Sequence, residues 1–183
     1  MEAAPPGSRV RAIVVMGVAG SGKSTVASLL AARLGWRFAE ADAYHSAANV
    51  AKMRSGTPLT DADRAPWLDA LADAIEGWRA SGDHGVIACS ALKRAYRERL
   101  IRGHADVRIA YLEGDYDTIA ARLASRTGHY MPATLLASQF EALEPPAPDE
   151  NAVVVAIDSP PEAAVDRILA ALGPASPPRD PAC

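Results

Sequence analysis

The sequence predicts an α/β fold in which a parallel five-stranded sheet lies between two layers of helices. Short apolar runs of roughly five residues alternate with longer segments of helical periodicity, and a glycine-rich loop joins the first run to the first helix. The apolar runs span residues 11–16, 36–39, 85–89, 107–112 and 152–157. Strands buried on both faces have continuous apolar sequences of this kind, so we expect the five runs to pair in parallel.

Helices are expected between these strands because start and stop signals bracket the periodic segments. The helix after the glycine loop stops at Gly35, and a longer helix starts at the capping signature Thr60 to Asp63 and stops at Gly82. The last helix is expected to open with a capping box at Ser159 and to close at Gly173. Further helical segments are predicted at 92–102, 115–126 and around 135–140.

The chain has the composition of a globular protein with one domain. Apolar residues make up 49% and charged residues 22% of its 183 residues, and no apolar run approaches the roughly 20 residues that span a bilayer. We predict a domain over residues 10–173. The proline-containing ends, 1–9 and 174–183, have no apolar periodicity and are predicted to be disordered tails.

Charge and cysteine content exclude several classes of partner. The net charge is −3 and no block of Lys and Arg is present, which argues against nucleic acid and membrane surfaces as main partners. Cys89 and Cys183 are the only cysteines and lack metal-ligand spacing. The apolar stretch near the N-terminus is short and lacks the layout of a signal peptide, so we expect a cytoplasmic enzyme.

The strongest motif is a phosphate-binding loop directly after the first predicted strand. Residues 17–24 fit the pattern G-x-x-x-x-G-K-[ST] at the start of a predicted helix. Glycines let backbone N–H groups face phosphate oxygens, Lys23 is expected to reach the β and γ phosphates, and Ser24 is expected to bind Mg²⁺. The predicted ATP-binding residues are Gly17, Val18, Ala19, Gly20, Ser21, Gly22, Lys23, Ser24 and Thr25.

A phosphate-binding loop alone does not define an activity, because kinases, GTPases and other ATPases share it. The guanine-reading motif N-K-x-D is absent, which argues against a GTPase. Tyr111-Leu112-Glu113 resembles the acidic end of a Walker-B strand and leaves a generic ATPase open. The carboxylates Glu40 and Asp42 follow the second strand, where an acceptor hydroxyl would lie beside the loop. Such a carboxylate can orient the hydroxyl and accept its proton.

A longer run of residues resembles the signature of bacterial-type gluconate kinases. The run is Asp42-x-x-His45-x-x-x-Asn49-x-x-Lys52-Met53-x-x-Gly56-x-Pro58-Leu59-x-Asp61-x-Asp63-Arg64-x-Pro66-Trp67-Leu68. Similar segments follow at Cys89-Ser90-Ala91-Leu92-Lys93, Tyr96-Arg97, Tyr111-Leu112-x-Gly114, Ser138-Gln139-Phe140 and Asp149-Glu150. The resemblance covers residues 12–172. It implies the P-loop kinase fold with a helical lid, ATP-dependent phosphorylation of D-gluconate to 6-phosphogluconate, Mg²⁺ as cofactor, and a homodimer.

The resemblance also implies roles for individual residues. Asp42 would act at the acceptor, and the arginines Arg122 and Arg126 would neutralise the transferred phosphoryl group from the base of a lid at about 126–147. Residues expected to bind the sugar acid are Asp42, His45, Arg64, Ser90, Lys93, Arg97, His129 and Gln139. Lys93 and Arg97 are four residues apart, so on a helix they would share one face. By themselves these two would also suit a solvated surface.

The chain departs from the family pattern at two places. Glu40-Ala41-Asp42 stands where the family has Asp-Gly-Asp, and Tyr130 stands where it has Phe. Glutamate keeps the charge and reaches one methylene further, so a water-mediated role for Glu40 at the metal is less firmly implied than the role of Asp42. Two rival functions stay open: the same fold acting on shikimate, a nucleotide or another small acceptor, and a regulatory ATPase module.

Overall fold

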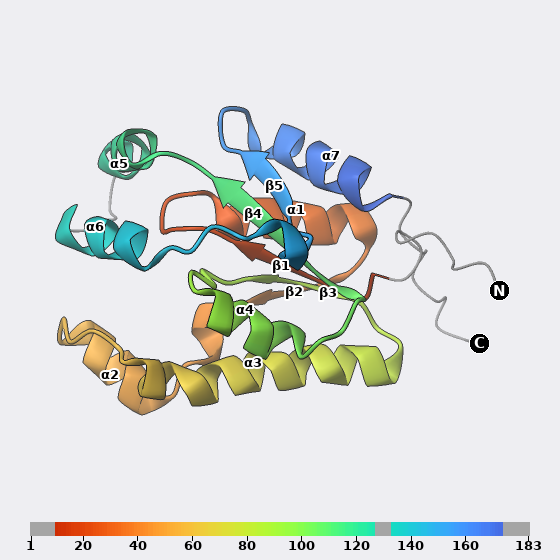
Figure 1. Cartoon of the computed structure of the whole chain (residues 1–183), viewed down its shortest axis with the longest axis horizontal. Helices are drawn as coiled ribbons and strands as arrows, with labels where there is room; N and C mark the ends of the chain where they lie inside the picture. Colours follow the sequence, from red (N-terminus) through yellow and green to blue (C-terminus); the bar gives the residue numbers. More distant parts are fainter. Residues whose placement is uncertain (1–9, 127–132, 174–183) are drawn as a thin grey trace.

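The computed structural model describes residues 10–126 and 133–173 (Figure 1). Within them, five parallel strands form one sheet in the order β2-β3-β1-β4-β5. The strands are β1 (Ala12–Met16), β2 (Arg37–Glu40), β3 (Gly85–Ala88), β4 (Val107–Glu113) and β5 (Val153–Ala156). Every residue of the central strand β1 is buried, because β3 and β4 pair with its two edges and helices cover both faces.

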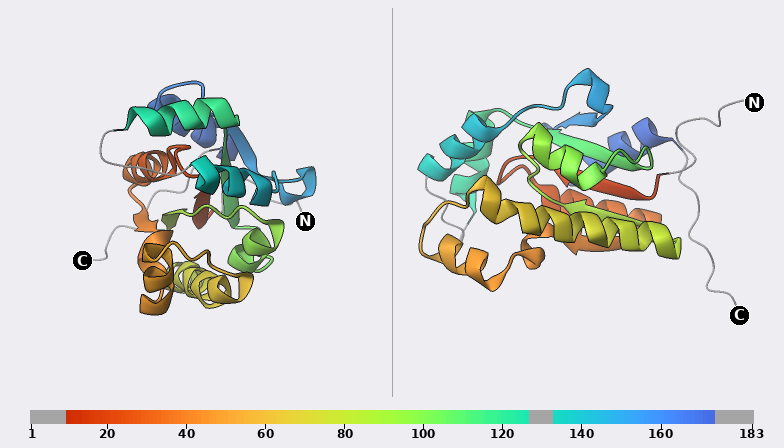
Figure 2. Two further views of the ribbon diagram at one scale, coloured as in Figure 1. Left: turned by 90° about the vertical axis from the view of Figure 1, so that its left-hand side faces the viewer. Right: turned by 60° about the horizontal axis from the view of Figure 1, so that its bottom comes forward.

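Helices cover the sheet on both sides and confirm the three-layer α/β fold (Figures 1 and 2). Helices α1 (Lys23–Leu34) and α7 (Pro161–Leu172) pack over one face in a core that also takes in Ile119 of α5 (Tyr116–Ser125). Helices α3 (Asp61–Ser81) and α4 (Arg94–Ile101) pack over the other face. The remaining helices are α2 (Ala47–Arg54), α6 (Ala133–Ala142) and the 3-10 turns η1 (Ala41–Tyr44) and η2 (Pro148–Glu150).

The start and stop signals that the sequence predicts for α1 and the capping box that it predicts for α3 are present in the structure. Gly22 and Gly35 bracket α1 in the left-handed conformation, with φ of 93° and 66°. The capping box at the start of α3 is complete: the Asp63 amide donates to Thr60 Oγ1 at 3.1 Å, and the Thr60 amide donates to the Asp63 carboxylate at 2.9 Å. These local signals therefore define where α1 and α3 begin.

Two local expectations differ from the structure. The predicted capping box at Ser159 is wrong: Pro160 occupies the N-cap of α7, and no side-chain cap bond forms. Helix α2 was not predicted, because its eight residues are too few to show a clear periodicity, and its N-cap Ser46 accepts the amide of Asn49. The predicted tails and residues 127–132 of the predicted lid lie outside the described residues.

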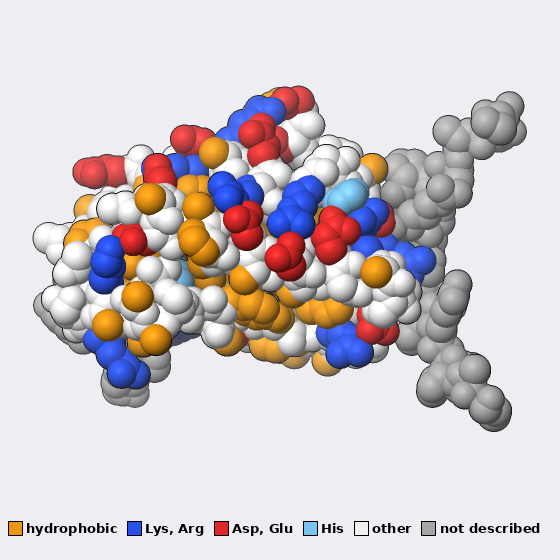
Figure 3. Space-filling model, turned by 90° about the horizontal axis from the view of Figure 1, so that it is seen from below, with side chains coloured by type: hydrophobic (Ala, Val, Ile, Leu, Met, Phe, Trp, Pro, Cys, Tyr) orange, Lys and Arg blue, Asp and Glu red, His pale blue; other side chains and the backbone are white. Residues whose placement is uncertain are grey.

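The carboxyl ends of the strands gather at the end of the molecule that is on the left in Figure 1. The glycine loop follows β1, η1 follows β2, and the turn at Ser90 follows β3. On the side of α3 and α4, Figure 3 shows charged side chains of both signs interleaved, and pairs such as Arg99 with Asp69 lie there. No helix in the described ranges is long and apolar enough to cross a membrane.

Candidate active site

The glycine loop after β1 has the backbone that a phosphate cradle requires. Gly17, Gly20 and Gly22 have φ of 152°, 82° and 93°. A Cβ at Gly20 would lie 2.7 Å from Cγ of Leu123, and a Cβ at Gly17 would lie 2.6 Å from the Ser21 hydroxyl oxygen. Side chains are therefore excluded at both positions, and the loop leads directly into the positive end of α1.

Lys23 lies over this loop and beside the carboxylates that follow β2. Its Nζ donates a hydrogen bond to the Val18 carbonyl at 3.0 Å. Burial lowers the pKa of Lys23, and the nearby charges of Asp42 and Glu40 act in the opposite direction. The ammonium group thus contacts the glycine loop and lies close enough to Asp42 and Glu40 to interact with their charges.

The first turn of α1 offers oxygen groups that suit Mg²⁺ in a nucleotide complex. Ser24 and Thr25 are exposed there, and the Ser24 hydroxyl is the predicted ligand. No group of three or more His, Cys, Asp or Glu side chains that could hold a metal occurs among the described residues. The exposed hydroxyls of Ser24 and Thr25 suit a cation that is held by few protein oxygens together with phosphates and water, as Mg²⁺ usually is at nucleotide sites.

The acceptor side begins at η1, immediately after β2. Asp42 is exposed there, and the His45 ring stacks on Trp67 with centroids 4.3 Å apart and planes 14° apart. Trp67 is in turn fixed by a hydrogen bond from Nε1 to the Ala41 carbonyl at 2.7 Å. Burial lowers the pKa of His45, so we expect a neutral imidazole at pH 7 that can both donate and accept a hydrogen bond.

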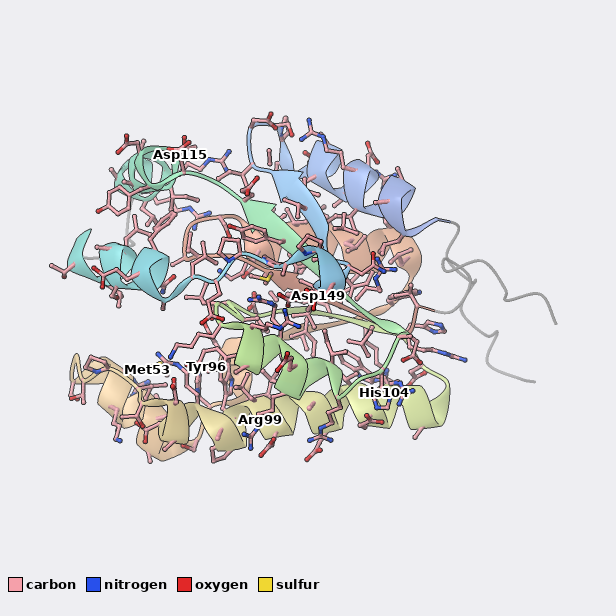
Figure 4. The ribbon with its side chains drawn as sticks, in the orientation of Figure 1. Met53, Tyr96, Arg99, His104, Asp115 and Asp149 are labelled. Carbon is pink, nitrogen blue, oxygen red and sulfur yellow. The ribbon has the colours of Figure 1, made fainter. Side chains whose placement is uncertain are left out.

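Arg64 and Lys93 converge on one aromatic ring, although they come from α3 and from the start of α4. The Arg64 guanidinium carbon lies 6.0 Å and Lys93 Nζ 5.5 Å from the ring centroid of Tyr96, which is labelled in Figure 4. Asp61 accepts hydrogen bonds from Lys93 at 3.1 Å and from the Tyr96 hydroxyl. These bonds hold the pKa of Asp61 below its usual range. We call Asp61, Arg64, Lys93 and Tyr96 the cation cluster.

The structure corrects the prediction that Arg97 faces the sugar acid beside Lys93. Arg97 is fully buried, and its side chain forms a bidentate pair with Glu150 at 2.6 and 2.8 Å. The reason is that Lys93 is the N-cap of α4, with φ of −94° and ψ of 146°, and so lies outside the helical spacing. The two cations therefore do not share a face.

Two of the residues that the sequence assigns to the acceptor have contacts to the glycine loop. Gln139 of α6 accepts a hydrogen bond from the Ala19 amide at 2.7 Å, so in this structure it contacts the glycine loop and not the cation cluster. The Ser90 carbonyl accepts the Gly17 amide at 3.3 Å, which joins the turn after β3 to the same loop. His129 lies outside the described residues.

The two lid-base arginines have different surroundings. Arg126 is exposed and close enough to Lys23 for its charge to lower that pKa. Arg122 donates from Nη2 to the Ile157 carbonyl at the end of β5. Of the pair, Arg126 is thus the one directed at the cradle in this structure.

Sequence reasoning did not identify the residues that hold the candidate site residues in position. Asp61 and Trp67 were named in the family signature without a role in the site, yet Asp61 accepts a hydrogen bond from Lys93 and Trp67 stacks on His45. Asn49 donates to the Asp63 carbonyl at 2.9 Å and links α2 to α3. The dense run of polar residues between 42 and 64 was the signal that could have found them.

Comparisons with known proteins show what this chain is similar to. The family model described as "AAA domain" matches residues 13–146. The chain is 45% identical over 163 residues to a gluconokinase of Gluconobacter oxydans (strain 621H), covering 89% of this chain and 92% of the relative.

Solved structures show the same relationship. The crystal structure of a gluconokinase from Sinorhizobium meliloti 1021 has a TM-score of 0.82 at 42% identity and covers 90% of this chain and 93% of that one. The shikimate kinase of Bacteroides thetaiotaomicron, at 19% identity and a TM-score of 0.62 over 86% of this chain and 96% of its own, shares the fold alone. With its phosphate cradle and with close relatives along nearly its whole length, this chain belongs to the gluconokinase family of P-loop kinases.

Proposed function

We propose that this protein transfers the terminal phosphoryl group of ATP to a hydroxyl of D-gluconate and forms 6-phosphogluconate. The observation that carries the proposal is a line of neighbouring polar groups, with His45 neutral among them, that runs from the cradle to the cation cluster. Lys23 interacts with Asp42, Asp42 with His45, and His45 with Arg64. A molecule that extends along this line would have one end at the transferred phosphoryl group and a negative end at the cations, as a linear sugar acid does.

On the nucleotide side, the chain's own groups bind and orient the phosphates. The amides of the glycine loop and the start of α1 would donate to phosphate oxygens, and Lys23 would exchange its bond to the Val18 carbonyl for the γ phosphate. Ser24 would hold Mg²⁺, which when bound neutralises charge on the β and γ phosphates. The cradle thus fixes the position of the reacting phosphorus.

On the acceptor side, Asp42 would orient the attacking hydroxyl. The hydroxyl oxygen forms a bond to the γ phosphorus while the bond from that phosphorus to the β–γ bridging oxygen breaks. ADP leaves, and the hydroxyl proton passes to the Asp42 carboxylate. His45 and Ser90 would hydrogen-bond neighbouring hydroxyls of the polyol chain.

The cation cluster would read the carboxylate of the sugar acid. Arg64 donates from Nη1 to the Leu59 carbonyl at 2.6 Å, which orients the guanidinium, and its side chain is 33% exposed and accessible to a ligand. Arginine offers parallel donors that suit a carboxylate, while Lys93 adds a second positive charge. The cluster holds two cations and the single anion Asp61, so a monoanionic ligand would balance it.

The segment from 126 to 147 is proposed to act as a lid over the phosphates. Its described helix α6 already contacts the cradle through Gln139, and Arg126 lies near Lys23. Closure would bring Arg122 and Arg126 to the transferred phosphoryl group and would exclude water, and His129 and Gln139 are proposed to bind the sugar acid.

ADP release with a panel of acceptors tests the proposal. We expect strong stimulation by D-gluconate and little by shikimate, nucleoside monophosphates or a neutral polyol of similar length. The product should be 6-phosphogluconate by mass spectrometry. Stimulation by another acceptor, or by a protein partner alone, would refute the assignment.

We further propose a homodimer in the cytoplasm, and the family resemblance supports both proposals. Light scattering after gel filtration measures the mass in solution, and a value near the 19.2 kDa of one chain would contradict the dimer. Fractionation of the source cell with an antibody tests the location.

A further inference from the structure

Arg97 is a fully buried cation whose N–H groups form hydrogen bonds to other residues of this chain. Its Nε and Nη2 donate to the two oxygens of Glu150, whose side chain is only 7% exposed. Nη1 donates to the carbonyls of Ala91 and Leu92 at 3.0 and 3.2 Å. A buried charge is tolerated only when it is paired and hydrogen-bonded, and here the requirement is met.

The two carbonyls that Arg97 binds belong to a turn with an unfavourable backbone. Ala91 has φ of 44°, in the left-handed region that a residue with a Cβ rarely adopts, and it is buried. Such a conformation persists only when its surroundings hold it. The bonds from Arg97 to the carbonyls of Ala91 and Leu92 provide that restraint.

This turn carries groups of the proposed acceptor side and contacts the glycine loop at one backbone bond. Ser90 precedes Ala91, and Lys93 of the cation cluster follows two residues later. The Ser90 carbonyl also accepts the Gly17 amide of the glycine loop at 3.3 Å. A change in the turn would therefore move Ser90 and Lys93 relative to the cradle.

Glu150 is itself held by the segment that follows α6. Its Oε1 accepts the Ala147 amide at 3.0 Å. Glu144 in the same segment donates its amide to the Leu92 carbonyl at 2.8 Å and accepts the Arg94 amide at 2.7 Å. The neighbouring Asp149, labelled in Figure 4, pairs with Arg94 at the surface. The segment 144–150, which follows α6 of the proposed lid, thus holds the turn after β3 in place through these hydrogen bonds.

We propose that Arg97, through its buried pair with Glu150, is a positioning residue that holds the strained turn at Ala91 and thereby sets Ser90 and Lys93 for the acceptor. The inference rests on the proposed function for the identity of that acceptor. Arg97 acts without touching the substrate. Its effect should therefore appear in acceptor binding and much less in ATP binding.

The first test is Glu150→Gln, which keeps the size of the side chain and removes its charge. We expect the KM for gluconate to rise by about tenfold or more, because small misplacements of binding groups are costly, and the KM for ATP to stay within about threefold. Asp149→Asn is the matched control: it breaks the exposed pair to Arg94 between the same two segments and should change either KM by less than about threefold.

A second-site substitution separates positioning from general stability. Ala91→Gly removes the cost of the left-handed conformation, so the turn no longer depends on its restraint. In the double variant with Glu150→Gln we expect the gluconate KM to return to within about threefold of the Ala91→Gly value, while the melting temperature stays low. Equal changes of both KM values in Glu150→Gln, or no recovery in the double variant, would overturn the proposal.

Hydrogen exchange of the folded protein gives a readout that does not depend on the acceptor. Peptides that span residues 89–93 should exchange faster in Glu150→Gln than in the parent, and peptides within α1, residues 23–34, should not. Unchanged exchange at 89–93 would refute the positioning role even if the ADP assay showed that gluconate is not the acceptor. A parent enzyme that ignores gluconate would refute only the proposed function.

Discussion

The nucleotide side and the acceptor side of this site are built in different ways. The proposed nucleotide groups come from nine consecutive residues, 17–25, which form the loop after β1 and the first turn of α1. The acceptor groups come from the end of β2, from α3 and from the turn before α4, and ion pairs hold many of them in place. A local motif fixes the chemistry at the cradle, whereas specificity depends on contacts between distant segments. The two sides should therefore respond differently to substitution.

The largest effect is expected at the cradle, where Lys23→Ala removes the charge at the γ phosphate. We expect kcat to fall by roughly 10³-fold or more, in the range of other cations that stabilise phosphoryl transfer. The fold should persist, because the glycine backbone defines the loop. Steady-state kinetics and circular dichroism check both statements, and near-normal turnover would overturn the mechanism.

Asp42→Asn tests whether Asp42 belongs to the acceptor side or to the nucleotide side. We expect kcat to fall by about 10²-fold, at the lower end of general-base effects, because a loose transition state demands little of the base. The KM for ATP should stay within a few fold. An equal loss of ATP affinity would instead place Asp42 at the metal.

On the acceptor side, Arg64→Ala should raise the KM for gluconate and spare the KM for ATP. Charge-assisted hydrogen bonds contribute roughly 1.5 to 3 kcal/mol each, which corresponds to about 10- to 150-fold. Arg64→Lys should recover the activity only in part, because lysine keeps the charge and loses the paired donors.

A neutral polyol of similar length is the control for Arg64. It should be a poor substrate for the parent and should lose little more in the variant. Equal losses for the polyol and for gluconate would show that Arg64 does not read the carboxylate, and a structural role at its 4.0 Å contact with Asp61 would then explain the loss.

The smallest expected effect concerns the support of α3 and not the chemistry. Hydrogen bonds from Lys52 and from the Thr60 amide lower the pKa of Asp63 from 3.8 to about 2. Since the folded pKa is depressed, this contribution to stability is present above pH 3.8 and is lost as the pH falls toward 2. Asp63→Asn should lower the melting temperature at pH 7 by a few degrees and flatten its decline below about pH 4. An unchanged acid profile would contradict the assignment.

The sequence predicted those features that depend on neighbours along the chain. The five strands, the glycine loop and the capping box at Thr60 need only local pattern, and the structure confirms them. The placement of Arg97 was wrong because a spacing of four residues implies a shared face only when both residues are helical, and Lys93 is a cap. No pattern in the sequence indicates that Glu150 lies beside Arg97, since 53 residues separate them.

The described domain begins and ends on the same side of the molecule. The start of β1 and the end of α7 lie at the same end of the sheet, opposite the glycine loop, as Figures 1 and 2 show. A fusion partner joined directly to the start of β1 or the end of α7 would therefore be attached at the end of the sheet away from the glycine loop. The same arrangement makes the domain a good candidate for circular permutation, with new ends opened in an exposed loop such as that at Gly103.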